Sequence, residues 1–230
     1  MNLATFRSRV ARVSGLSTSD SADLADLDSW INEAVEQFNR ETKLNIATAS
    51  LAVTADQDTY SLDTDILAMQ ALWYAPADSQ SALMTALAPE TLIERKLTMT
   101  GEDTPPRYYA LIGGNALMLW PAPTSSTETL HMLYVPRHAA LSLTADSPAT
   151  SSKGNVPEEY HPILEAYAKW KACEAEDHRM SQFGNVFKEQ WDTGVAKVKA
   201  EVKKKAGINV PAVRLGRPRH VPVGNGIDLR

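Results

Sequence analysis

The chain has 230 residues, of which 43% are apolar and 22% charged, with a formal net charge of -5 and a single cysteine. A chain of this length and composition buries a sizeable core without disulfides or a structural metal, so it belongs among globular rather than disordered proteins. One cysteine excludes an intramolecular disulfide and a cysteine-based zinc site, and no run approaches the ~18 apolar residues of a membrane span. We therefore expect a soluble protein of a reducing compartment, without a targeting segment.

The net charge is divided unevenly along the chain. Residues 197–230 contain nine basic and two acidic residues, a charge of +7, whereas residues 1–196 contain 14 basic and 26 acidic residues, a charge of -12. The sequence therefore predicts an acidic folded body and a cationic C-terminal arm, each suited to a different partner.

Helical periodicity opens the chain. Apolar residues spaced three and four apart predict a short helix from Leu3 to about Val13, which Gly15 ends. A second helix of about twenty residues has an apolar stripe from Leu24 to Phe38, with aspartates in its first turns, where the helix dipole favours negative charge.

Strand-like patterns replace the helical period from about Leu44. Pro89 begins a predicted short helix within this region. Short apolar runs bounded by turn residues predict strands at 51–53, 60–62, 66–74 and about 129–135.

The strongest local signal is a β-hairpin. Two apolar runs, Arg107–Ile112 and Ala116–Trp120, flank a Gly-Gly-Asn turn, whose residues accept the positive φ that tight turns require. With the neighbouring strands, the hairpin predicts one mostly antiparallel sheet of about five or six strands in residues 46–143.

Helical periodicity returns after a polar connector at 144–155. Pro157 opens a helix with an apolar stripe that runs to about His178, and a break near Met180 precedes a longer helix that Gly207 ends. The apolar stripe of this last helix consists of Phe183, Phe187, Trp191, Val195, Val198 and Val202.

This order of helices, strands and helices predicts an α+β fold. Its core is an α-helical bundle formed by the N-terminal helices (residues 1–45) and the C-terminal helices (144–206). A mostly antiparallel β-rich insertion (46–143) interrupts the bundle, and an extended basic tail (207–230) follows it.

No assembled catalytic site is recognisable in the sequence. It contains none of the phosphate-loop, dinucleotide-binding, nucleophile-elbow or HExxH patterns. Cys173 lies on the apolar stripe of its helix and is interpreted as a buried structural residue. Glu174 and His178 stand at i, i+4 as two metal-type ligands, but no second motif completes them, so a solvated helix end is favoured. We predict no enzymatic activity, no cofactor and no metal.

The cationic arm is the remaining signal. Lys203–Lys205 stabilise the end of the last helix through its dipole in the simplest interpretation. Beyond them, Val and Leu alternate with Arg and Pro and no aromatic residue is available to stack on a base, which favours docking on a protein over binding to nucleic acid. The predicted docking residues are Val210, Val213, Arg214, Leu215, Arg217, Arg219, Val221, Val223, Ile227, Leu229 and Arg230.

Several short motifs follow one another in a familiar order. They are the Trp30-containing helix that ends in Phe38–Leu44, then Leu51-x-Val53, Asp58–Leu62, Pro106-x-Tyr108 with the Gly-Gly hairpin, Leu119–Pro123, Leu130–Tyr134, and Val156–His161 with Ala166–Ala168. This order and spacing, over about residues 20–205, resembles the head-to-tail connector (adaptor) proteins of tailed bacteriophages.

The resemblance implies a structural role in the virion. Such proteins form a homo-oligomeric ring, usually of twelve copies, beneath the portal protein at the capsid vertex. C-terminal segments dock on the portal, and a downstream neck or tail protein binds the far side. The resemblance thus implies assembly in the bacterial host cytoplasm and a place at the head-tail junction of the virion. DNA passes through the channel of such a ring without sequence-specific binding, and no membrane or catalytic residue is involved. If the acidic body of the chain lines this channel, its negative charge would repel the DNA.

Three other interpretations stay open. In the first, the chain is another phage neck or tail protein, such as a stopper or terminator. In the second, it is a nucleic-acid-binding accessory protein that uses the basic tail. In the third, it is a small hydrolase with unrecognised carboxylates.

Overall fold

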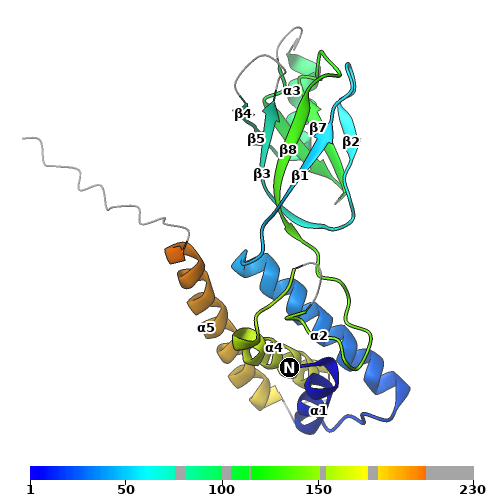
Figure 1. Cartoon of the computed structure of the whole chain (residues 1–230), viewed down its shortest axis with the longest axis vertical. Coiled ribbons are helices and arrows are strands. Elements are labelled where there is room, and N and C mark those ends of the chain that lie inside the picture. The colour runs from blue at the N-terminus through cyan, green and yellow to red at the C-terminus, as the bar shows by residue number, and fades with distance from the viewer. Residues whose placement is uncertain (76–80, 100–104, 114, 151–153, 176–180, 206–230) are drawn as a thin grey trace, which may run out of the picture.

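The molecule is elongated, with a helical part at one end and a β part at the other (Figure 1). The computed structural model describes residues 1–75, 81–99, 105–113, 115–150, 154–175 and 181–205. Within these ranges the architecture is α+β, as predicted.

The two N-terminal helices are α1 (Leu3–Ser14) and α2 (Ser21–Thr42). Asn2 caps α1 by accepting from the backbone N–H of Thr5, and Asp20 caps α2 by accepting from those of Ala22 and Asp23, N–H groups of the first turn that have no intrahelical partner. Gly15 ends α1 with a φ of 82°, a left-handed conformation that glycine adopts without a Cβ penalty. Both predicted helices are confirmed.

The C-terminal helices complete the helical part. They are the short 3-10 helix η1 (Glu158–Tyr160), α4 (His161–Ala175) and α5 (Ser181–Lys205). The predicted helix ends at His178 and Gly207, and the break near Met180, lie outside the described residues.

One apolar core joins helices from both ends of the chain. Phe38 of α2 and Tyr167 of α4 both contact Trp191 of α5, with ring centroids 6.3 Å and 4.7 Å from it. Leu3 and Phe6 of α1 belong to the same buried cluster. The predicted bundle of N- and C-terminal helices is therefore confirmed.

The prediction of a single sheet is wrong. The strands that the structure describes form two four-stranded sheets that face each other. The first has the order β1 (Ala47–Ala52), β8 (Thr129–Pro136), β3 (Ile66–Ala75) and β4 (Ala82–Leu83). The second has the order β2 (Thr59–Ser61), β7 (Ala116–Trp120), β6 (Tyr108–Ile112) and β5 (Thr85–Ala86).

The predicted hairpin is present in the second sheet. Strands β6 and β7 pair antiparallel, with Ile112 opposite Ala116, and Gly113 in the turn has a φ of 59°. The other described pairs are also antiparallel except that of β5 with β6. The mostly antiparallel character is thus confirmed.

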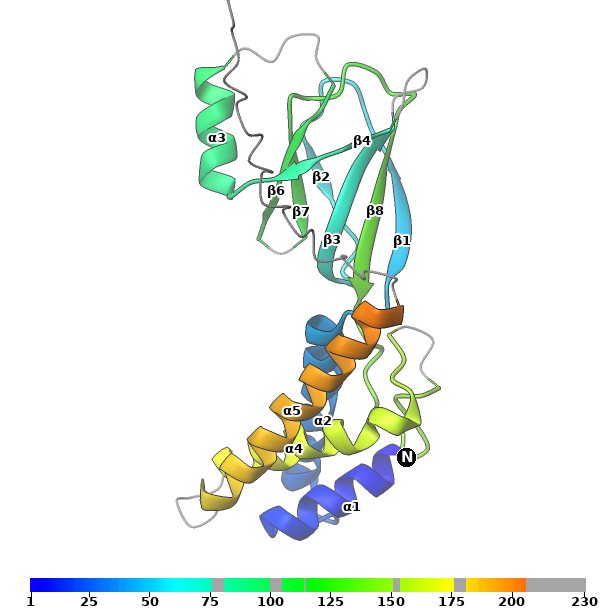
Figure 2. The ribbon, with the colours of Figure 1, turned by 90° about the vertical axis from the view of Figure 1, so that its left-hand side faces the viewer.

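The two sheets enclose a second core, separate from that of the helices. Leu72 and Leu130 from the first sheet meet Leu117 and Leu119 from the second. Helix α3 (Pro89–Thr98) lies outside the second sheet (Figure 2), where its buried Leu92 packs against strands β6 and β7.

The β part ends earlier than the predicted boundary at residue 143. Strand β8 stops at Pro136, and the following segment runs along the helical part. Leu141 is buried in the helical core, and its backbone N–H and C=O both bond to the side chain of Asn32 on α2. The last residues of the predicted insertion therefore pack with the bundle.

Candidate interaction surfaces

The predicted docking residues, from Val210 to Arg230, all lie outside the described residues, which end at Lys205. The described part of the cationic arm is residues 197–205 of α5, and its Lys203–Lys205 are exposed in the last turn of that helix. A cation there interacts favourably with the helix dipole, in accord with the simplest interpretation of these lysines.

Of the reactive residues that the sequence offers, the described ones, Cys173 and Glu174, are respectively buried and hydrogen-bonded to neighbours on the same helix. Cys173 is buried, as predicted. Glu174 accepts hydrogen bonds from Trp170 at 2.8 Å and from Lys171 at 3.2 Å, while His178 lies outside the described residues. Within the described ranges, no group of three or more His, Cys, Asp or Glu side chains is placed to hold a metal ion. Nor does any helix of these ranges have the length and apolar character needed to cross a bilayer.

A polar network holds the joint between the two parts, which we call the waist and define as residues 43–46 and 136–138. Asn39, fully buried at the end of α2, donates to the carbonyl of Gly154 at 2.7 Å. Asn45 donates to Asn39 Oδ1 at 2.9 Å and to the carbonyl of Asn155 at 2.6 Å. Since buried amide groups are costly to leave unpaired, this network fixes the chain where it enters the β part.

Two open recesses flank the waist. One, of about 460 Å³, is lined by Asp63, Asp65, Asn115 and Arg137 among others. The other, of about 370 Å³, shares Asp65 and is also lined by Asn45, Ile46 and Tyr134 among others. Thr64 also lines the first recess, and the hydrogen bond described for its carboxylates is a local turn contact, in which Asp63 accepts from the backbone N–H of Asp65 at 3.1 Å.

Helices α1, α4 and α5 together form a surface that we call the cationic–aromatic face, defined by Arg9, Arg12, Lys169, Phe183, Val186 and Phe187. Arg9 and Lys169 both bind Glu165, at 3.0 Å and 2.6 Å. Burial alone would raise the pKa of Glu165, but the hydrogen bonds from Lys169 and Arg9 outweigh it and hold that pKa below its usual value. The ammonium group of Lys169 also lies 5.5 Å from the ring centroid of Phe187, within cation–π range.

The apolar period of the sequence does not predict the aromatic portion of this face. Phe183 is 55% exposed and Val186 50% exposed, although Phe183 was expected on the buried stripe of its helix. The reason is the close approach of α5 to α4 through Gly184, where a Cβ atom would lie 3.5 Å from the Cβ of Cys173. Because Gly184 occupies the line of contact, the neighbouring Phe183 is displaced to its side. The spacing Phe183-x-x-Val186-Phe187 was the signal that could have revealed this patch.

An acidic surface covers the first half of α2. Asp20 and Asp26 are exposed and Asp23 half-exposed, beside exposed Ala22 and Ala25. In Figure 2, α2 lies behind α4 and α5, and in Figure 1 its N-terminal end is at the opposite edge of the helical part from α5. This acidic face of α2 and the α5 portion of the cationic–aromatic face therefore belong to different sides of the bundle.

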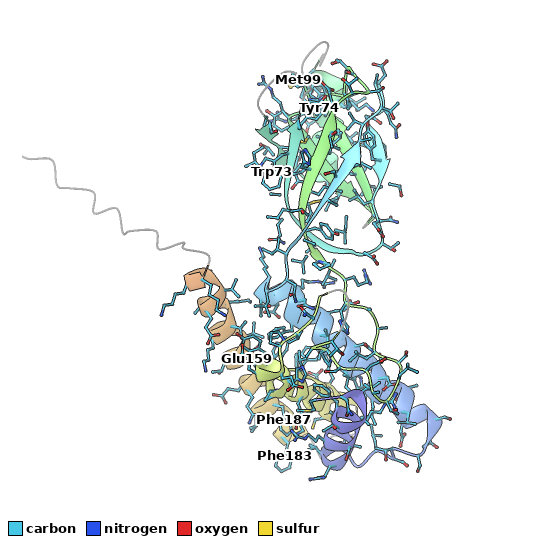
Figure 3. All side chains as sticks on the ribbon, viewed as in Figure 1. Trp73, Tyr74, Met99, Glu159, Phe183 and Phe187 are labelled. Atoms are coloured by element: carbon cyan, nitrogen blue, oxygen red, sulfur yellow. The ribbon has the colours of Figure 1, made fainter. Side chains whose placement is uncertain are left out.

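A further apolar group lies at the far end of the β part. Ile93, Leu97 and Met99, at the end of α3, are 43%, 81% and 52% exposed. Figure 3 places Met99 at one end of the molecule and Phe183 and Phe187 at the other. Exposed apolar groups thus mark both ends of the elongated molecule, a common property of protein-binding surfaces.

These features define a class of protein. The fold is a helical bundle with an inserted pair of facing sheets, and clusters of charged and exposed apolar side chains lie on its outer surfaces. This is expected of a protein that assembles with other proteins. The sequence model of the SU10 adaptor protein family matches residues 1–214, and the chain belongs to this family of phage head-to-tail adaptors. No curated protein matches the chain.

The family confirms the resemblance drawn from the sequence. The chain is a phage adaptor protein, and membership implies a place at the neck of the virion, oligomerisation, and portal and tail partners. Enzymatic activity is not expected of a structural adaptor family.

Proposed function

We propose that the chain forms a closed ring beneath the portal at the capsid vertex, which joins the capsid to the tail and leaves a channel through which DNA passes. The observation that supports this most strongly is the match of the adaptor family over residues 1–214, which spans the helical part, the β part and the beginning of the cationic tail. The ring has twelve copies in this proposal, by resemblance to other connector adaptors.

The architecture suits a protein that connects two partners. A ring of identical chains closes through a heterologous interface, in which each copy presents two different surfaces to its neighbours. The elongated shape then leaves the two ends of each copy for the portal on one side and a downstream neck or tail protein on the other (Figure 1).

The cationic tail is the proposed portal contact. In the sequence it follows Lys205, the last described residue of α5. Its apolar residues, such as Val213, Leu215 and Val221, would bind the portal surface, while its arginines would meet acidic groups there.

The decisive measurement is the mass of the isolated protein and of its mixture with the portal, by native mass spectrometry. A ring that forms alone or on the portal is the expected result. Failure to associate with any portal at native salt would refute the adaptor ring, and binding to a tail protein instead would indicate a stopper or terminator.

A matched pair of tail variants separates portal docking from DNA binding. Changing Val213, Leu215 and Val221 to Ser keeps the tail's charge, and should abolish portal binding without altering DNA affinity. Removal of residues 207–230 should likewise abolish portal binding. If that removal instead lowers DNA affinity with a steep salt dependence, the nucleic-acid-binding interpretation is correct.

A further inference from the structure

The cationic–aromatic face leaves large apolar side chains in water. Phe183 and Val186 are about half-exposed and one turn apart on α5, and Phe187 lies beside them under the ammonium group of Lys169. Aromatic residues and arginine are enriched at protein interfaces, and a cluster of this kind marks an anchor for a partner rather than a solvated helix face.

The charge of this face specifies the partner's chemistry. Arg9 and Lys169 share the single carboxylate of Glu165, so their combined charge is only partly neutralised. Arg12 adds an exposed cation in the last turn of α1. The residues of this face with Glu165 thus have a net positive charge, and the complementary surface is acidic with small side chains that admit aromatic rings.

The chain itself contains such a surface. The N-cap Asp20 and, in the first half of α2, Asp26 are exposed, Asp23 is half-exposed, and the small residues Ala22 and Ala25 lie among them. Helix α1 packs on α2 within one chain, where Arg7 pairs with Asp28. The aromatic portion of the face, on α5, lies on the other side of the bundle from α2, so one chain cannot bring that portion to its own acidic surface, whereas two chains can (Figures 1 and 2).

We propose that the cationic–aromatic face of one copy binds the acidic face of α2 of a second copy, and that this contact is the heterologous interface of the ring. Phe183 and Phe187 lie against the alanines of α2, and the cations of α1 and α4 meet its aspartates. This inference rests on the proposed function, since it assumes that the ring forms.

Charge reversal in the full-length chain tests the pairing. Arg12→Glu and Asp26→Arg, each alone, should raise the concentration needed for ring assembly by about tenfold or more, because like charges then oppose each other at every interface. The double variant Arg12→Glu/Asp26→Arg restores opposite charges and should assemble again. An equimolar mixture of the two single variants should also form rings, in which the two chains alternate.

Two controls change exposed residues outside the proposed interface. Arg40→Glu reverses an exposed cation at the other end of α2 and should leave assembly unchanged. Phe183→Ser should weaken assembly, whereas Leu97→Ser, at an even more exposed apolar position on α3, should not. Circular dichroism of each variant verifies that the chain is folded.

A second measurement uses the unaltered protein. Carbodiimide treatment of rings assembled from mixed ¹⁴N and ¹⁵N chains should join the Asp23–Asp26 segment of one chain to Lys169 or Lys188 of another. Absence of this link from intact rings would contradict the pairing.

The outcomes separate this inference from the proposed function. If the wild-type chain forms no ring with or without the portal, the ring and its interface both fail. If wild-type rings form and the single reversals assemble equally well, the ring stands and the interface is wrong. Loss of assembly without rescue in the double variant would likewise overturn the pairing, and loss of portal or DNA binding alone would assign the face to that partner.

Discussion

The close packing of α4 and α5 gives the sharpest test of the helical part. At Gly194, a Cβ atom would lie 2.8 Å from Cγ1 of Ile163 and 3.0 Å from both its Cδ1 and its Cγ2. At Gly184, ten residues earlier in the same helix, the nearest atoms would be 3.5 Å and 3.9 Å away, on Cys173 and Trp170. The same substitution by Ala therefore meets a clash at one position and ordinary contact at the other.

The expected magnitudes follow from two opposing effects. Replacing Gly by Ala in a helix interior stabilises it by about 1 kcal/mol. Overpacking costs about 1–3 kcal/mol, and the upper half of that range applies at Gly194, because β-branched Ile163 has a single favoured rotamer in a helix. Gly194→Ala should thus lower the free energy of unfolding by about 1–2 kcal/mol. Gly184→Ala should raise it by up to about 1 kcal/mol.

Urea unfolding followed by helical circular dichroism measures both variants. The background Ile163→Ala supplies the internal check, because removal of the clashing atoms should turn Gly194→Ala from destabilising to stabilising. A Gly194→Ala chain as stable as the wild type, or a loss of stability that persists in the Ile163→Ala background, would refute this account of the α4–α5 contact.

Three further predictions concern buried polar groups. Asn39→Ala leaves the buried carbonyl of Gly154 without its donor, so it should lower the free energy of unfolding by about 2 kcal/mol. Hydrogen exchange at residues 154–155 should become faster, and unchanged exchange would argue against the network. Tyr167→Phe removes a 2.6 Å hydrogen bond to Glu33 and should destabilise the chain by about 1–3 kcal/mol in urea, whereas wild-type stability would show the bond to be unimportant. Burial lowers the pKa of His161, so the unfolded chain binds its proton more tightly and the free energy of unfolding should fall as the pH drops below about 6.5, down to the native pKa. His161→Gln should flatten this slope, and an identical slope in the variant would disprove the assignment.

The helices were predictable because their signals are local. The apolar period of α2, its Asp20 cap and the glycine after α1 all lie within a few residues of the structure they specify. The β6–β7 hairpin was predictable for the same reason, since the Gly-Gly-Asn turn fixes which strands pair.

The division into two sheets was not predictable from such signals. A period of two shows that a strand has two faces, but it does not identify the neighbouring strand. Strands β4 and β5 contain two residues each, too few for any period, and β5 pairs parallel with β6 across the segment that contains α3. Their pairing depends on tertiary packing alone.

The candidate surfaces also differ in whether local sequence signals predict them. The charge asymmetry predicts a docking tail, whose predicted residues begin beyond the described part of the chain. The cationic–aromatic face instead combines α1 with α4 and α5, which lie more than a hundred residues away in the sequence. The exposed position of Phe183 depends on the glycine beside it, a packing effect that hydrophobic periodicity does not include.

The waist also has a consequence for how the chain folds. The bundle needs helices from both ends of the sequence, and closing so long a loop costs about 4 kcal/mol of chain entropy before any helix contact forms. Pairing of β1 with β8, which sets Ala47 opposite Tyr134, brings the two ends of the insertion together within the β part itself. If the sheets form first, α2 and α4 meet as neighbours on a short tether. The insertion then acts as the nucleus from which the bundle assembles, and mutations in the β1–β8 ladder should slow the folding of helices that they never touch.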